Sequence, residues 1–130
     1  MLLRLRAYAV SIMTFAAIVY LSFFRPPRVE PLEQVIGFDK LVHALMYGFL
    51  AFVIGWEYRR DHRLRPLLPR RLWVFSAALP IGLGLAIEIL QGTLTAYRSC
   101  DVWDFVADTI GVLLACLVAR RVFRKPSSPA

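Results

Sequence analysis

Four apolar segments, separated by short charged stretches, are the feature that most limits what this chain can fold into. They cover about residues 7–24, 41–56, 72–94 and 102–119. A helix that crosses a bilayer needs about 20 mostly apolar residues, within a working range of about 17–25. The composition agrees, because the chain is 58% hydrophobic, whereas soluble domains are about 45–50% apolar. The sequence therefore predicts an all-α protein, a four-helix transmembrane bundle.

The length of the chain limits its organisation. With 130 residues it has room for one small domain, which we place at residues 1–125. The tail at 126–130 is polar and rich in proline, so we expect it to be disordered. The first apolar segment exceeds the usual core of a signal peptide and lacks a small-x-small cleavage site, which favours an uncleaved helix.

The placement of Lys and Arg predicts the orientation. Twelve of the 16 lie at the amino end, in the middle loop and in the tail. Because positive charge stays in the cytoplasm, we expect both termini to be cytoplasmic, in a multi-pass protein of the cell (inner or cytoplasmic) membrane. The connections at 25–40 and 95–101 then face outward. Basic clusters between apolar segments are typical of topology signals, so we expect no nucleic-acid partner.

Three acids stand at the start of the last apolar segment: Asp101, Asp104 and Asp108. Their spacing of three and four residues places them near one face of a helix. Charged groups in membrane helices turn toward the bundle interior or a water-filled cavity, so we expect these acids to face the other helices. The predicted orientation brings them to the outer face, where the second segment begins and the third ends.

Other polar residues reach the same end from the second and third segments. His43 and Tyr47 share one helix face, and a second face carries two further polar residues; both faces continue into small residues, a pattern typical of helix packing in membranes. We expect a pocket that opens outward, floored by Tyr47, Glu88 and Asp108. The candidate pocket or ligand-binding residues are Asp39, Lys40, His43, Tyr47, Glu88, Gln91, Arg98, Asp101, Asp104 and Asp108.

Two structural explanations compete with a binding site. Asp39 and Asp101 each precede a predicted helix and could cap it by accepting a hydrogen bond from a backbone amide. An ion-pair cluster with Lys40 and Arg98 is the other explanation. Such a cluster counts five acids against two permanent bases, and this surplus favours a cation, a proton or a basic ligand group. The sequence assigns no catalytic residue, metal ion or cofactor.

Cysteine and proline give further local predictions. Cys100 falls in a predicted loop and Cys116 inside a predicted helix, so we expect neither a disulfide between them nor a cysteine zinc site. In the third segment Pro80, with two nearby glycines, predicts a kink or close helix packing.

The polar residues resemble the motifs of the VanZ-like family of small membrane proteins. Four pieces carry the resemblance within residues 36–120: Asp-Lys-x-x-His-x-x-x-aromatic at 39–47, Glu-x-x-Gln at 88–91, Arg98, and Asp-x-x-x-Asp-x-x-Gly at 104–111, which is similar to the family's Asp-x-x-x-Asn-x-x-Gly. Asp108 stands where the family commonly has Asn, which adds a negative charge. The resemblance implies a role in the cell envelope, and the family takes its name from a protein linked to low-level resistance to the glycopeptide antibiotic teicoplanin.

Three classes of function stay open. The one we favour is an outward-facing protein that binds a membrane lipid headgroup, an envelope precursor or an amphiphilic drug, with Arg98 and Lys40 holding anionic groups and the acids holding amines or a divalent ion. The second is a membrane enzyme acting on a lipid-linked phosphate or ester by metal or acid/base catalysis. His43 or Glu88 would be the general base, the Asp group would hold a metal, and an activated water would attack. The third is proton- or cation-coupled transport, for which four spans are few, so a homo-oligomer would be needed.

Overall fold

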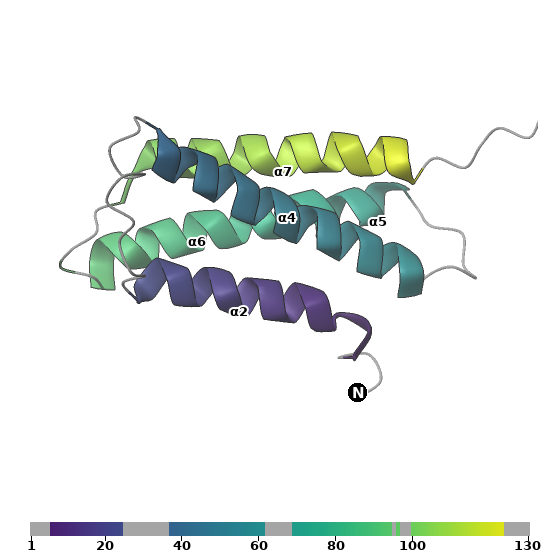
Figure 1. Cartoon of the computed structure of the whole chain (residues 1–130), viewed down its shortest axis with the longest axis horizontal. Helices are drawn as coiled ribbons and strands as arrows, with labels where there is room; N and C mark the ends of the chain where they lie inside the picture. Colours follow the sequence, from purple (N-terminus) through teal and green to yellow (C-terminus); the bar gives the residue numbers. More distant parts are fainter. Residues whose placement is uncertain (1–5, 25–36, 62–68, 95, 97–99, 124–130) are drawn as a thin grey trace, which may run out of the picture.

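The computed structural model describes residues 6–24, 37–61, 69–94, 96 and 100–123, and all regular structure in these ranges is helical. The predicted all-α class is confirmed (Figure 1). The elements in chain order are α2 (Ala9–Phe23), α4 (Phe38–Asp61), α5 (Pro69–Trp73), the π-helical turn η1 (Val74–Ala78), α6 (Leu79–Leu94) and α7 (Val102–Val122). The tail predicted to be disordered lies outside the described residues.

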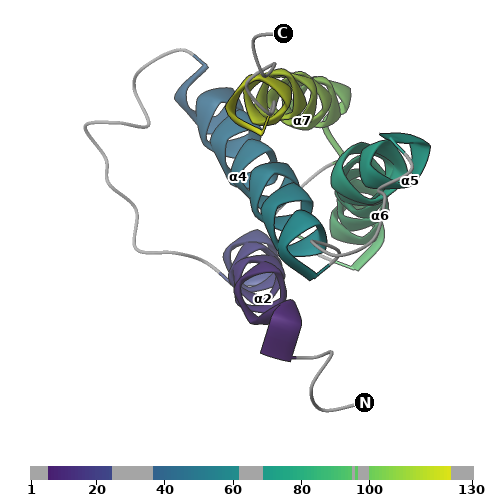
Figure 2. The ribbon, with the colours of Figure 1, turned by 90° about the vertical axis from the view of Figure 1, so that its right-hand side faces the viewer.

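The helices form an antiparallel bundle in which the chain reverses direction at each connection (Figure 1). Figure 2 shows α4 in the middle, with α2 on one side and α7 and α6 on the other. The buried apolar core lies where these four helices meet and includes Ile18, Leu50, Ile87 and Val112.

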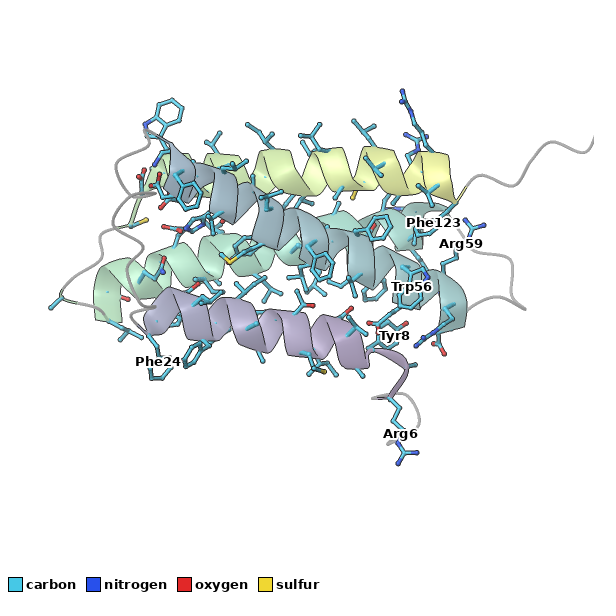
Figure 3. All side chains as sticks on the ribbon, in the orientation of Figure 1. Arg6, Tyr8, Phe24, Trp56, Arg59 and Phe123 are labelled. Atoms are coloured by element: carbon cyan, nitrogen blue, oxygen red, sulfur yellow. The ribbon has the colours of Figure 1, made fainter. Side chains whose placement is uncertain are left out.

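The bundle has two chemically different ends. α4 and α7 begin at the end where α2 and α6 finish, and we name it the acidic end after Asp39, Asp101 and Asp104. The opposite end, the basic end, carries Arg59 and Arg120 near the finish of α4 and α7. In Figure 3 Arg59 and Arg6 lie at this end and Phe24 at the other.

Three of the described helices are long and apolar enough to cross a membrane: Phe38–Asp61, Arg70–Leu94 and Val102–Val122. They contain the second, third and fourth predicted segments and extend beyond most of the predicted bounds. The first predicted segment, 7–24, forms the 15-residue helix α2. At 1.5 Å per residue α2 is about 22 Å long, less than the about 30 Å of a hydrocarbon core.

Small residues let α4 and α7 approach closely, and this is the most extensive helix contact in the described structure. A Cβ atom added to Gly111 would collide with the backbone carbonyl of Ala44. One added to Gly48 would lie 2.9 Å from the carbonyl oxygen of Gly111. Since membrane helices lack a hydrophobic driving force for association, such backbone contacts provide much of their packing energy.

The third segment contains a π-helical turn directly before Pro80. Proline has no N–H and its ring crowds the carbonyl four residues earlier, here that of Ser76. The turn relieves this conflict, since the Leu79 amide donates to the carbonyl of Val74 instead. The Sγ of Cys116 lies 3.7 Å from the carbonyl oxygen of Ser76 and donates to it. A π-turn that contacts α7 therefore lies where Pro80 predicts a kink or close helix packing.

A buried carboxylate attaches α2 to α4. Glu57, 0% exposed, accepts hydrogen bonds from the backbone amides of Val10 and Ser11, both at 3.0 Å. The Ser11 hydroxyl donates to the same carboxylate at 2.6 Å. These amides belong to the first turn of α2, where backbone N–H groups have no acceptor within the helix. A negative charge beside this turn is also favourable. Glu57 was not among the residues predicted to matter, and it fixes the start of the first helix.

Candidate functional site

The first turns of α7 carry three acids toward α4 and α6. Asp101 is the N-cap residue and accepts from the Trp103 amide at 2.8 Å, so the predicted capping role of Asp101 is confirmed. Asp104 and Asp108 follow at three and four residues. Asp108 lies about 10 Å along the helix axis from the N-cap residue and is completely buried. The helical spacing therefore runs from a half-buried N-cap residue to a fully buried carboxylate.

His43 of α4 lies between two of these acids. Its Nδ1 is 3.0 Å from Oδ1 of Asp108, and its Nε2 is 3.7 Å from Oδ2 of Asp104. The imidazole stacks on the ring of Tyr47, one turn further along α4, with a centroid distance of 6.4 Å. A carboxylate near each ring nitrogen fixes the orientation of the imidazole.

The second oxygen of Asp108 stands out because Oδ2 is buried and has no hydrogen-bond partner among the described residues. It packs against Gly84 of α6, where an added Cβ would lie 3.0 Å from it and 3.3 Å from the ring of Tyr47. Glycine at this position therefore makes room for the carboxylate. A buried polar atom without a partner costs free energy, so this oxygen calls for an explanation.

Glu88 of α6 completes the buried group. It is 2% exposed, and its Oε2 accepts from the backbone amide of Asp101 at 3.2 Å. Glu88, His43 and Asp108 each offer one ligand atom, and these atoms all lie within 4.8 Å of one another. Residues from three helices, far apart in the sequence, thus meet as predicted.

Lys40 joins α4 to α7 at the acidic end of the bundle, next to this buried group. Its Nζ lies 3.1 Å from Asp39, 3.2 Å from Asp101 and 3.1 Å from Asp104. An ammonium group has three donors, so these carboxylates occupy all of them. This arrangement favours a structural role for Lys40, which links the two helices by ion pairs, over the binding of anionic ligand groups predicted as an alternative.

Asp39 does not cap α4, because the helix already begins at Phe38 and places Asp39 in its first turn.

At Asp101, outside the helix, the Trp103 amide and then Lys40 hold the pKa of the carboxyl below its usual value, against the opposing effect of desolvation. Both interactions favour the charged form.

Two other candidates stand apart from the cluster. Gln91 is buried, and its Nε2 donates to the carbonyl of Ser22 at 2.8 Å, which ties α6 to the end of α2. Arg98 lies outside the described residues. The structure thus joins seven of the ten candidates, His43, Tyr47, Glu88, Asp101, Asp104, Asp108 and Lys40, with Asp39 attached through Lys40.

Two cavities lie away from these residues. One, of about 480 Å³, is at the basic end and is lined by Trp73, Cys116 and Arg120, among others. The other, of about 450 Å³, lies between α2, α4 and the third segment and is largely apolar. The outward pocket over Tyr47, Glu88 and Asp108 stays a prediction.

The sequence profile of the VanZ/LLP1 family matches residues 4–124. The chain belongs to the VanZ/LLP1 family. The match confirms the resemblance found in the polar motifs and extends it to the first helix, so the helix held by Glu57 is part of the VanZ/LLP1 unit. Comparisons with curated proteins and with solved structures give no match.

Proposed function

We propose that this VanZ/LLP1 protein resides in the cell membrane and acts in the cell envelope, where its acidic end recognises a lipid headgroup, an envelope precursor or a teicoplanin-type drug. One observation carries the proposal: the acidic end holds more carboxylates than its own bases can neutralise. Asp39, Glu88, Asp101, Asp104 and Asp108 face one lysine and one histidine among the described residues. Counting Arg98 from the sequence still leaves three more acids than permanent bases.

The surplus indicates the charge of the ligand. Since Lys40 is fully engaged by three carboxylates, the anionic part of a headgroup finds no unused lysine donor there. Ammonium groups, which headgroups, precursor peptides and glycopeptides carry, would be the complementary partners. Charged residues within membrane helices commonly mark ligand or ion pathways, which supports a binding role for Asp104 and the residues below it.

Lipid selectivity tests the proposal. Protein purified with equal amounts of phosphatidylethanolamine and phosphatidylglycerol should retain the amine-bearing lipid in native mass spectrometry. Asp104→Asn should reduce this preference, whereas Asp61→Asn, which removes the same charge at the basic end, should preserve it. Equal retention of both lipids by the wild type, or an equal effect of both variants, would contradict amine recognition by the acidic end.

The outward orientation has its own test in the native cysteines. Cys100 is exposed at the acidic end, and Cys116 is buried. A membrane-impermeant maleimide should therefore label intact cells that express the wild type and leave Cys100→Ser unlabelled. Labelling of the wild type only after the membrane is permeabilised would show that the acidic end faces the cytoplasm.

An enzyme is the second candidate, favoured by the 3.0 Å contact between His43 and Asp108. A carboxylate that orients an imidazole is the arrangement of a general base, which here would activate a water toward a lipid-linked phosphate or ester. Purified protein incubated with a diacylglycerol pyrophosphate would release phosphate, and His43→Gln would abolish the release. No release by the folded wild type would count against this candidate.

A further inference from the structure

We propose that His43, Glu88 and Asp108 bind one divalent transition-metal ion, of which Zn²⁺ is the simplest probe. This inference deepens the proposed function and rests on it in treating the acidic end as a binding site. The three side chains come from α4, α6 and α7, and all are buried. One imidazole nitrogen and two carboxylate oxygens form a donor set that suits Zn²⁺, Mn²⁺ or Fe²⁺.

The distances bring the donors close to a coordination sphere. All three ligand atoms lie within 4.8 Å of one another. Ligands bound to tetrahedral zinc at about 2.0–2.2 Å lie about 3.3–3.6 Å from each other. Side-chain movements of about 1 Å would therefore bring the donors onto one ion. Three protein ligands also leave a position open for water or for a ligand group.

The unpartnered oxygen of Asp108 is an independent sign of a missing partner. Oδ1 is already engaged by His43, while Oδ2 is buried and without a hydrogen bond among the described residues. It lies against Gly84, one helical turn before Glu88, so it faces the part of α6 that carries the second carboxylate. A cation shared with Glu88 would satisfy this oxygen and neutralise two buried acids at once.

Asp104 is placed to support His43 as a ligand. Nδ1 of His43 would exchange its hydrogen bond to Asp108 for the ion, and Nε2, which faces Oδ2 of Asp104 at 3.7 Å, would then carry the proton. A carboxylate on the far nitrogen of a metal-binding histidine orients the ring and raises its basicity. Asp104 is then a positioning residue, which distinguishes it from the three ligands.

The donor set also excludes some cations. Ca²⁺ prefers six to eight oxygen ligands, and Mg²⁺ prefers an octahedron of oxygens and keeps several waters. A site with an imidazole and only two carboxylates offers neither. We therefore expect Zn²⁺ to bind in the presence of a large excess of Mg²⁺ or Ca²⁺.

Metal content and affinity test the inference. Protein purified in detergent without a polyhistidine tag, stripped with chelator and reloaded with Zn²⁺, should hold one equivalent by elemental analysis. Asp108→Asn and Glu88→Gln should each weaken Zn²⁺ binding by about 10–100-fold in competition with a chelator. The matched control Asp61→Asn should bind as the wild type does. Co²⁺ should give visible absorption bands in the wild type that Asp108→Asn loses.

Several results would overturn the metal site. Wild type that stays helical by circular dichroism yet retains less than 0.1 equivalent of Zn²⁺ would do so, as would equal loss in Asp61→Asn. Ser11→Ala, which disturbs α2 at the far side of α4, shows whether a weakened fold alone lowers affinity; equal weakening by this variant would also overturn the site. Zn²⁺ binding without any lipid preference would support the metal site and reject headgroup recognition. A lipid preference without Zn²⁺ binding would support headgroup recognition and reject the metal site.

Discussion

Glu57 and Asp108 are two carboxylates with the same burial and opposite surroundings. Both residues are 0% exposed. Glu57 receives three hydrogen bonds from the first turn of α2, whereas Asp108 has one hydrogen bond, to His43, and an oxygen with no hydrogen-bond partner among the described residues. Burial alone therefore does not separate a structural acid from a binding one. The number of satisfied oxygens does, because both oxygens of Glu57 already accept hydrogen bonds, whereas one oxygen of Asp108 is left to contact a ligand.

The largest expected effect is the loss of the structural carboxylate. Glu57→Ala removes the acceptor of all three hydrogen bonds and leaves the partly buried amide of Val10 and the buried amide of Ser11 without this partner. We expect the free energy of unfolding to fall by about 3–5 kcal/mol. Unfolding in mixed micelles, followed by circular dichroism, measures this change. A loss below about 1 kcal/mol would mean that α2 does not depend on Glu57.

Ser11→Ala should have an intermediate effect. It removes only the 2.6 Å hydroxyl bond to Glu57 and leaves both amide bonds in place. A hydrogen bond to a charged group is worth about 1.5–3 kcal/mol, so the same unfolding experiment should show a loss in that range. Because Ser11 and Glu57 act on one contact, adding Ser11→Ala to Glu57→Ala should cost little more than Glu57→Ala alone. Full additivity would contradict a shared contact.

Asp101→Ala should destabilise the protein less than Ser11→Ala, and in a pH-dependent way. The lowered pKa of Asp101 means that its charged form is favoured in the folded state. Its contribution is therefore complete above the ordinary aspartate pKa of about 4 and is lost as the pH falls through the lower folded value. The stability difference between wild type and variant, measured at several pH values, should shrink below about pH 4. A constant difference would assign the effect to something other than this carboxylate.

The smallest effect on stability belongs to the binding carboxylate. Asp108→Asn keeps an oxygen for His43 and exchanges an unpartnered charged oxygen for a neutral amide group, so the desolvation cost falls. We expect the free energy of unfolding in chelator to change by less than about 1 kcal/mol in either direction. Unfolding with and without chelator measures it. A loss as large as that of Glu57→Ala would show that Asp108 is also structural.

The sequence was enough to predict the helices and the meeting of the polar residues. Length and hydropathy define the three long helices, and the helical period places Asp104 and Asp108 on the face that meets His43. Positions three and four residues apart are fixed by the backbone, so this part of the site follows from local geometry.

Other features depend on contacts that no local pattern encodes. Glu57 lies beside Arg59 and Arg60, where an acid resembles an ordinary member of a charged helix end. Its partners include backbone amides of another helix. Because every residue except proline has such an amide, the sequence does not show which ones Glu57 meets. The hydrogen bond from Cys116 to the carbonyl of Ser76 in the π-turn likewise comes from another helix, and the position of Asp39 inside α4 depends on where that helix starts.

The central claim is that the carboxylates of the acidic end bind a ligand while Glu57 holds the fold. The most direct test is the shift in unfolding temperature on adding Zn²⁺ in detergent. At 100 times the dissociation constant a ligand stabilises the folded state by about 2.7 kcal/mol. Our account predicts a clear rise for the wild type and for Ser11→Ala, and none for Asp108→Asn. An equal rise in Asp108→Asn, or no rise in the wild type, would contradict it.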